Sequence, residues 1–270
     1  MGDLLDMVGC DPRIQSAREA IFSGSEEDIR ATSFHLSGLT TIGPKLDAIR
    51  AQKLDILKTL LEMDRTITED LVAAACEQKD RECVRMLLDF GWPIDKRIYH
   101  AASLLWYATD DKDFMSWLIS MGADINVRCQ LGQPVLARAI VCGDIDVVHL
   151  LFENQAEVKH GDLLHCAAER EHHDEGAGIA KALVQRGVGV NTFRYDNPVA
   201  MPLRAMHRLP TPLHVACRKQ NLPVAQVLVQ NGADAYMQMR EAGNSCPPSA
   251  LEIARTKGNR ELINLLLGNT

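Results

Sequence analysis

The residues with the greatest capacity for chemistry lie close together between positions 160 and 175. This stretch holds histidines, a cysteine and carboxylates, the side chains that bind zinc in proteins. Their spacing matches neither H-x₃-H nor C-x₂-C, and the adjacent histidines at 172 and 173 point in different directions on any regular element. The sequence therefore favours a solvated loop between two helices over a metal site for these residues: His160, His165, Cys166, His172, His173, Asp174 and Glu175.

The eight cysteines offer candidate nucleophiles and redox pairs, but no two of them form a C-x-x-C pair. Cys76 and Cys217 occupy positions where small core residues are expected, and a reactive thiol needs an exposed, electropositive setting. No G-x-S-x-G elbow, Gly-rich phosphate loop or H-E-x-x-H motif occurs in the chain. We therefore expect reduced thiols, a cytoplasmic or nuclear location, no cofactor, no metal and no enzymatic activity.

Composition narrows the class of protein further. Hydrophobic residues make up 46% of the 270 residues and charged residues 24%, as in ordinary folded proteins, and the 5% of aromatic residues is typical of helical ones. The net charge of −7 argues against sequence-independent binding of nucleic acid, which needs many cations on phosphates. No signal sequence and no apolar run of about 18 residues is visible, so we expect no membrane association.

A repeated pattern must position the residues named above. The segment from Thr211 to Ala235 contains two short helical patterns and then a glycine, and the same frame recurs upstream. Neither helix is long enough to be stable alone, so each pair must bury its apolar side against the neighbouring pairs. In the segment from Thr211 we expect the core positions to be Leu213, Ala216, Cys217, Val224, Val227 and Leu228.

The turn after each second helix marks the period. Glycine there adopts the left-handed conformation that ends a helix. Gln155 stands in one of these positions, and we expect strain or a different turn there. The steps between the turn positions are 31, 33, 32 and 45 residues, and the positions are Gly91, Gly122, Gln155, Gly187 and Gly232.

The period, the T-P-L-H-x-A signature at 211–216 and the G-A-D endings at 122–124 and 232–234 resemble the ankyrin repeat. The resemblance implies an all-α fold, an ankyrin-repeat solenoid of about six to eight stacked helix-turn-helix units with short hairpin loops. Degenerate copies are expected over residues 1–67, and the main array over 68–270, with a long loop at 192–209 and a capping repeat at its end. His165 and His214 take the signature's histidine position, where we expect hydrogen bonds that fix the turn.

The resemblance also implies where a partner binds. Contact residues in ankyrin-like stacks lie at the hairpin tips and at the solvent-facing end of each first helix, along a concave groove. Those helix ends change from acidic to basic along this chain, and the long loop adds aromatic and methionine residues that interfaces favour. We expect a protein or peptide partner, preferably acidic, at these residues: Tyr107, Asp110, Asp111, Glu169, Arg170, Tyr195, Met201, Arg204, Arg208, Arg218 and Lys219.

Alternative interpretations stay open at this point. The charges are also consistent with ordinary solvated surface, and Trp106 is interpreted as core rather than contact. The partner could instead meet the acidic positions around Glu77, Asp110 and Asp111. A different class of function is a small-molecule enzyme or ligand-binding protein with an enclosed pocket between the groove and the 192–209 loop, built from Tyr107, Glu169, Arg170, His207 and Arg218.

Overall fold

The computed structural model describes residues 41–159, 162–196 and 207–268, together with Gln15 and Glu19. Helices occur in pairs joined by short turns, and they group into two compact units, Met1–Tyr99 and His100–Thr270. Of the degenerate copies expected over residues 1–67, the part before residue 41 lies almost wholly outside the described residues, and the division expected at residue 67 stays a prediction.

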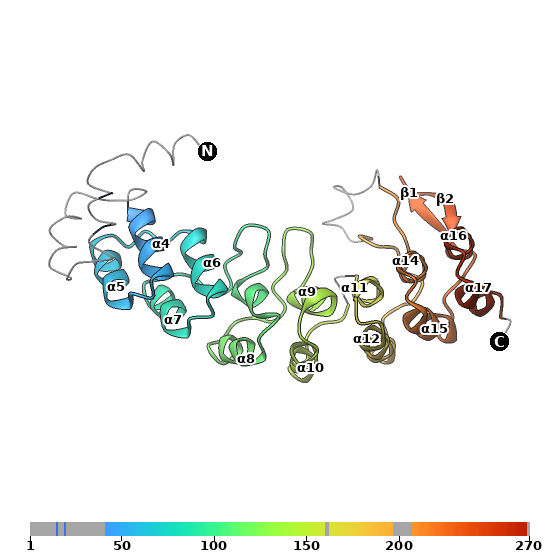
Figure 1. Ribbon diagram of the computed structural model, residues 1–270, viewed down its shortest axis with the longest axis horizontal. Helices are drawn as coiled ribbons and strands as arrows, with labels where there is room; N and C mark the ends of the chain where they lie inside the picture. Colours follow the sequence, from blue (N-terminus) through green and yellow to red (C-terminus); the bar gives the residue numbers. More distant parts are fainter. Residues whose placement is uncertain (1–14, 16–18, 20–40, 160–161, 197–206, 269–270) are drawn as a thin grey trace. The chain divides into compact units, whose positions relative to one another are not determined.

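From residue 41 onward, the first unit contains two helical pairs. Each helix buries one apolar side, as Leu57, Leu60 and Leu61 do in the second of them, and neighbouring pairs pack side by side. The helices are α4 (Ile42–Arg50), α5 (Leu54–Met63), α6 (Glu69–Glu77) and α7 (Arg81–Asp89), shown in blue to green in Figure 1.

A buried lysine joins the two ends of the first pair. Lys45 is fully buried, and its ammonium donates to the backbone oxygens of Asp64 at 2.6 Å and Thr66 at 2.9 Å and lies 3.5 Å from the Asp64 carboxylate. Burial alone would raise the pKa of Asp64, but hydrogen bonds from Thr41 and Thr66 and the charge of Lys45 outweigh burial and lower it to about 2. These hydrogen bonds and this ion pair compensate the desolvation of the lysine.

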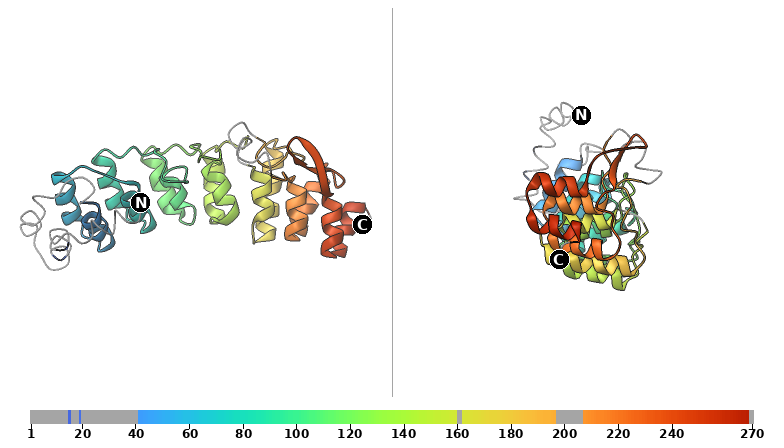
Figure 2. Two further views of the ribbon diagram at one scale, coloured as in Figure 1. Left: turned by 90° about the horizontal axis from the view of Figure 1, so that it is seen from above. Right: turned by 90° about the vertical axis from the view of Figure 1, so that its right-hand side faces the viewer.

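The described residues of the second unit form five helical pairs in two layers. The first helix of each pair lies in one layer and the second helix in the other, which Figure 1 shows as two rows. Figure 2 shows the same helical pairs from above, where the two layers overlap. The first-helix layer consists of η2 (Leu104–Ala108), α9 (Val135–Cys142), α11 (Leu163–Glu169), α14 (Pro212–Lys219) and α16 (Ala250–Lys257). The second-helix layer consists of α8 (Lys112–Ser120), α10 (Ile145–Glu153), α12 (His173–Gln185), α15 (Leu222–Gln230) and α17 (Arg260–Leu267).

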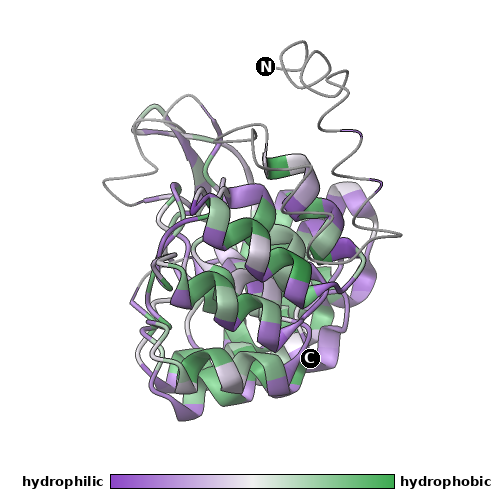
Figure 3. Ribbon diagram, turned by 90° about the vertical axis from the view of Figure 1, so that its left-hand side faces the viewer, coloured by the Kyte–Doolittle hydropathy of each residue, from purple (hydrophilic) through white to green (hydrophobic). Residues whose placement is uncertain are grey.

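The core lies between these helices, as the sequence predicts. Leu213, Ala216, Cys217, Val224 and Leu228 are fully buried, whereas Val227 is half-buried. In Figure 3 the helices carry apolar and polar residues on different sides, as amphipathic helices do. No helix within the described residues is both long enough and apolar enough to cross a bilayer.

The predicted turn positions share one backbone conformation. Gly91, Gly122, Gly187 and Gly232 have φ between 86° and 107°. Gln155 also has a positive φ, of 60°. Its N–H and the N–H of the next residue donate to carbonyls of the preceding helix, and the same two hydrogen bonds form at Gly187. The different turn is therefore not formed, and the non-glycine residue takes the left-handed conformation that the turn requires.

Most second helices begin with an aspartate or asparagine cap. The side-chain oxygen of each cap accepts a hydrogen bond from an N–H of the first helical turn, which would otherwise have no partner. The capping residues are Asp80 of α7, Asp111 of α8, Asp144 of α10, Asn221 of α15 and Asn259 of α17.

Two helices depart from the expected pattern. The stretch from the cap Ser103 to the cap Asp111 is two residues shorter than the matching stretch from Thr211 to Asn221, and the first helix there is the tighter 3₁₀ form, η2. The run 171–175 was expected to be a loop. Instead, residues from His173 onward form the first turn of α12, which is longer than its neighbours.

A small hairpin interrupts the helical pattern before the last pair. Strands β1 (Gln238–Glu241) and β2 (Asn244–Ser249) pair antiparallel. Leu209, at the end of the long loop, bridges to Arg240 of β1 with backbone hydrogen bonds of 2.7 and 3.1 Å. The loop at 192–209 and this hairpin therefore support each other.

Candidate functional site

The signature histidines act as structural ties, as expected from the sequence. His214 Nδ1 accepts a hydrogen bond of 3.1 Å from the Thr211 backbone N–H and lies 2.7 Å from its hydroxyl. Its Nε2 lies 3.2 Å from the backbone oxygen of Pro248, just before the cap of α16. This imidazole therefore fixes its own helix start and holds the next repeat.

His165 forms the same link one repeat earlier. The side chain is fully buried, and Nε2 lies 3.0 Å from the backbone oxygen of Pro210, just before the cap of α14. Burial lowers the pKa of His165 to about 3 and that of His214 to about 4. Both imidazoles are therefore neutral at physiological pH, and neither is exposed to a substrate.

The cysteines have the character of core residues. Cys76 and Cys217 are fully buried, and burial raises the pKa of the Cys217 thiol to about 12. Burial also raises the pKa of Cys76 strongly. Neither thiol is a nucleophile in this setting.

Arg170 is a correction to the predicted binding surface. Its side chain is only 5% exposed, and its guanidinium donates to the backbone oxygens of Ala139, Ile140 and Gly143 at 2.8–3.2 Å. These carbonyls lie at the end of α9, where helical oxygens lack partners within the helix. Arg170 also forms an ion pair with Glu175 at 2.6 Å. It therefore joins two repeats and is not available to a partner.

Glu169, at the end of α11, is approached by two arginines. Arg194 from the long loop forms two bonds with its carboxylate, of 2.5 and 3.0 Å, and Arg218 at the end of α14 lies 3.9 Å away. Burial alone would lower the pKa of Arg194, but the hydrogen bond and charge of Glu169 raise it above its ordinary value. The Arg194–Glu169 pair therefore holds the start of the long loop against the first-helix layer.

Further contacts fix residues 193–196 of that loop. The backbone N–H of Tyr195 donates to Asp162 at 3.1 Å, and the Arg194 guanidinium lies over the Tyr195 ring. The Arg240 guanidinium lies 4.2 Å from the centre of the Phe193 ring and 3.5 Å from the Asp196 carboxylate. Tyr195 is half-buried, so its expected contact with a partner stays a prediction.

The remaining basic residues of the predicted site are exposed where they are described. Arg218 and Lys219 end α14, and the Arg218 side chain is 47% exposed. Arg208 is 58% exposed and lies 3.5 Å from Glu241. Met201 and Arg204 lie outside the described residues.

The neighbouring helix extends this charged surface. Helix α16 packs beside α14 and also ends in exposed cations, Arg255 and Lys257. We call the four residues Arg218, Lys219, Arg255 and Lys257 the C-terminal basic edge. The repeat pattern in the sequence indicated the ends of the first helices, but it missed Arg255, which lies in the last turn of α16, two residues before its end.

The acidic members of the predicted site lie elsewhere in the same unit. Asp110 is exposed, whereas Asp111 caps α8 by accepting a hydrogen bond of 2.8 Å from the Phe114 N–H. Tyr107 is half-buried in η2, and α9 and α11 separate that helix from α14. Trp106, interpreted as core, is half-buried with the Arg138 guanidinium 5.2 Å from its ring centre. The acidic and basic halves are therefore separate surfaces.

The structure gives no support to a ligand pocket built from the residues first considered. Glu169 is neutralised by Arg194, and Arg170 is buried in contacts with backbone oxygens. Within the described part of the chain, no group of three or more histidine, cysteine or acidic residues is placed to hold a metal ion. A groove of about 450 Å³ does occur, but it lies between α10 and α12 on the second-helix layer.

Comparison with known proteins agrees with this architecture. A family model of ankyrin repeats matches residues 71–162 and 136–239, which together span more than half of the chain. The chain therefore belongs to the ankyrin-repeat family, a class whose members generally mediate protein–protein interaction.

A solved structure shows the same fold at low sequence similarity. The human ASB11 ankyrin repeat domain is 20% identical in sequence and matches with a TM-score of 0.57, covering 84% of this chain and 97% of that chain. No curated protein matches the chain significantly. The family and the fold are thus established, and the identity of the partner has to be sought on the surface.

Proposed function

We propose that this chain is a non-catalytic interaction module that binds an acidic segment of a partner protein along the C-terminal basic edge and the adjoining long loop. The observation that carries the proposal is the alignment of exposed cations on two packed helices, α14 and α16. Like charges collected on one edge attract an acidic partner and orient it during encounter.

The charge balance of this edge supports the proposal. Glu169 lies 3.9 Å from Arg218, but its carboxylate is already bound closely by Arg194, so Arg218 keeps much of its capacity to attract an anion. Arg208 and, by prediction, Arg204 and Met201 would extend the contact into the long loop. The free thiols among the described cysteines are consistent with a cytoplasmic or nuclear site of action, which we include in the proposal.

Charge reversal tests the proposed surface. Tagged wild-type protein and the Arg218→Glu/Lys219→Glu variant would capture partners from the native source, with quantitative mass spectrometry as the readout. The control is Lys112→Glu/Lys181→Glu, which makes the same charge change at exposed residues of the second-helix layer. We expect specific partners to be lost only from the first variant, and association with a captured partner to slow as salt rises. Equal capture by both variants would refute the proposed surface.

Shortening the long loop gives a second test. The structure limits the deletion to residues 197–206, because Arg194 and Tyr195 hold the loop to the first-helix layer. Replacing 197–206 by a short Gly-Ser bridge should weaken partner binding and leave the melting temperature nearly unchanged. Unchanged affinity would remove the loop from the contact and leave the basic edge alone.

A further inference from the structure

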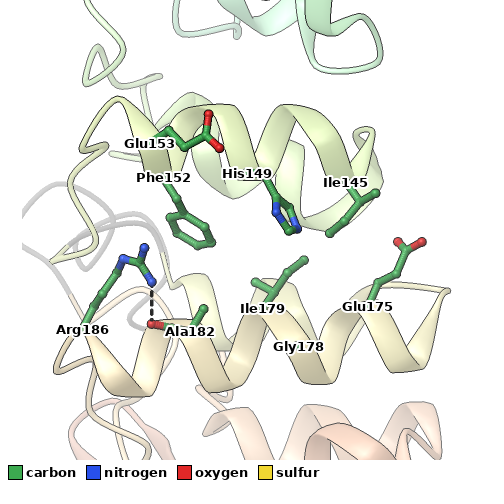
Figure 4. Close-up of a pocket in the computed structure, with 9 residues that line it drawn as sticks. All are labelled: Ile145, His149, Phe152, Glu153, Glu175, Gly178, Ile179, Ala182 and Arg186. Atoms are coloured by element: carbon green, nitrogen blue, oxygen red, sulfur yellow. Dashed lines mark hydrogen bonds between the residues drawn. The ribbon is translucent and has the colours of Figure 1, made fainter.

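The second-helix layer contains an open groove that the proposed function does not use. It runs between α10 and α12, with Phe152 and Arg186 at one end and Ile145 and Glu175 at the other (Figure 4). Its volume of about 450 Å³ falls in the range of ligand-binding clefts. We call this feature the outer groove.

Small residues on α12 create the outer groove. Gly178 and Ala182 face α10 where a larger side chain would fill the space, and a Cβ added at Gly178 would meet no atom within 4 Å. On its opposite side α12 packs closely, since a Cβ at Gly176 would lie 3.2 Å from Val224. The helix is therefore fixed by α15 and leaves an apolar surface uncovered toward α10.

The walls of the outer groove are apolar at their base and charged at their rim. Phe152 is half-buried and Ile179 is buried, and both contribute apolar surface to the base. The Arg186 guanidinium lies 4.4 Å from the centre of the Phe152 ring and donates to the Ala182 backbone oxygen at 3.1 Å. This cation is thus engaged within its own chain.

Acidic residues outnumber lysine and arginine among the residues that line the outer groove, because Glu153 and Glu175 stand against Arg186. Glu153, exposed on α10, and Glu175, partly exposed on α12, line the groove. The exposed residues Asp146 and Asp174 do not line it, but each is the sequence neighbour of a lining residue, Ile145 and Glu175. Glu175 is paired with Arg170, whereas the other three have only the exposed cation Lys181 and the engaged Arg186 on these helices. An occupant with positive charge complements such a rim.

We propose that the outer groove is a docking site for a segment of a partner protein that carries one or two large apolar side chains flanked by lysine or arginine. The apolar side chains would lie between Phe152 and Ile179, and the flanking cations would pair with the acidic rim. This is the helix-in-groove or peptide-in-groove mode, in which buried apolar residues give affinity and rim charges give orientation. It uses none of the residues of the C-terminal basic edge.

A peptide-display selection tests this proposal without knowledge of the partner. A random peptide library would be selected on the full-length wild-type chain and depleted on the Gly178→Leu variant, which fills the groove. We expect the enriched sequences to combine large apolar residues with lysine or arginine. An acidic consensus, or a consensus without apolar residues, would overturn the proposal.

Binding of one enriched synthetic peptide then gives the quantitative test. We expect its affinity to fall at least about tenfold for Gly178→Leu and for Glu153→Lys. Lys181→Leu is the matched control, because it adds the same side chain to the same helix at a position that does not line the groove. It should not lower affinity, and the loss of its positive charge can only favour a basic peptide. Because leucine replaces glycine within a helix at a position with free space, Gly178→Leu should melt no lower than wild type.

Two outcomes would reject the proposed occupant. Equal binding to wild type and Gly178→Leu would show that the peptide binds elsewhere. Sedimentation that shows a wild-type dimer, abolished by Gly178→Leu, would show that a second copy fills the groove. The Arg218→Glu/Lys219→Glu variant should retain peptide affinity, so failure here is distinguishable from failure of the proposed function.

Discussion

Replacing Gln155 by glycine should stabilise the second unit. Gln155 is exposed and has φ of 60°, and a left-handed conformation costs an L-residue with a side chain about 1–2 kcal/mol. Glycine removes that cost but gives the unfolded chain more freedom, a loss of about 0.5–1 kcal/mol. The net gain in the free energy of unfolding is therefore about 0.5–1 kcal/mol, or a rise of about 1–4 °C in melting temperature for a unit of this size.

Urea unfolding followed by far-ultraviolet circular dichroism measures this gain, and two variants separate its causes. Gln155→Ala removes the side chain but keeps the left-handed strain, so it should be nearly neutral. Gly187→Ala places a Cβ in open space at φ of 86°, so it adds strain of about 1–2 kcal/mol and reduces the freedom of the unfolded chain by about 0.5–1 kcal/mol. It should therefore destabilise by about 0.5–1 kcal/mol. If Gln155→Gly proved neutral or destabilising while Gly187→Ala behaved as expected, the reasoning about Gln155 would be wrong.

Two further predictions concern buried polar groups. The pKa values of His165 and His214 are about 3 and 4 in the folded chain, whereas that of an unfolded histidine is about 6.5. Their contribution to the free energy of unfolding is therefore complete above pH 6.5 and is lost as pH falls toward 4. At pH 5.5 the loss is about 1.4 kcal/mol for each histidine. Urea unfolding at several pH values measures this loss. A free energy of unfolding that does not change from pH 7 to 5.5 would show that the imidazoles are not held neutral. Arg170→Ala removes the guanidinium donor of Ile140 O and Gly143 O at the end of α9, whereas Ala139 O keeps the Gly143 N–H, and it should destabilise by about 2–4 kcal/mol. Arg218→Ala at a 47% exposed position should change stability by less than about 0.5 kcal/mol.

The sequence alone was enough to predict the architecture, because the repeat is encoded locally. The turn glycines mark the ends of second helices, and the signature histidines mark the starts of first helices, so both follow from spacing. The 3₁₀ helix η2 was not predicted, since it arises from two missing residues within one repeat. The first turn of α12 was also missed, because two adjacent histidines and three acidic residues resemble a solvated turn until Arg170 pairs with Glu175.

The candidate site was less predictable, because a residue's position in the repeat determines which way its side chain starts out but not which groups surround that side chain. Glu169 and Arg170 are adjacent at the end of α11, and the repeat pattern predicted that both contact a partner. The structure gives them different roles, since Arg170 turns inward to the end of α9 and Glu169 receives Arg194 from a loop 25 residues away. Neither contact has a local sequence signal, because each depends on how neighbouring repeats stack.

Each helix layer packs through its inner side and leaves its outer side exposed, so two separate surfaces are available for binding. Packing between neighbouring repeats uses the inner sides of both layers, together with buried ties such as His165 to Pro210 and Arg170 to α9. The outer side of each layer contributes little to that packing, so its residues can change at small cost in stability. On the first-helix layer the exposed residues include the C-terminal basic edge, and on the second-helix layer they include Glu153 and Glu175 beside the outer groove, which Gly178 leaves open. Surfaces of opposite charge on opposite layers would allow one chain to hold an acidic and a basic partner at the same time, which the charge-reversal and groove-filling variants can separate.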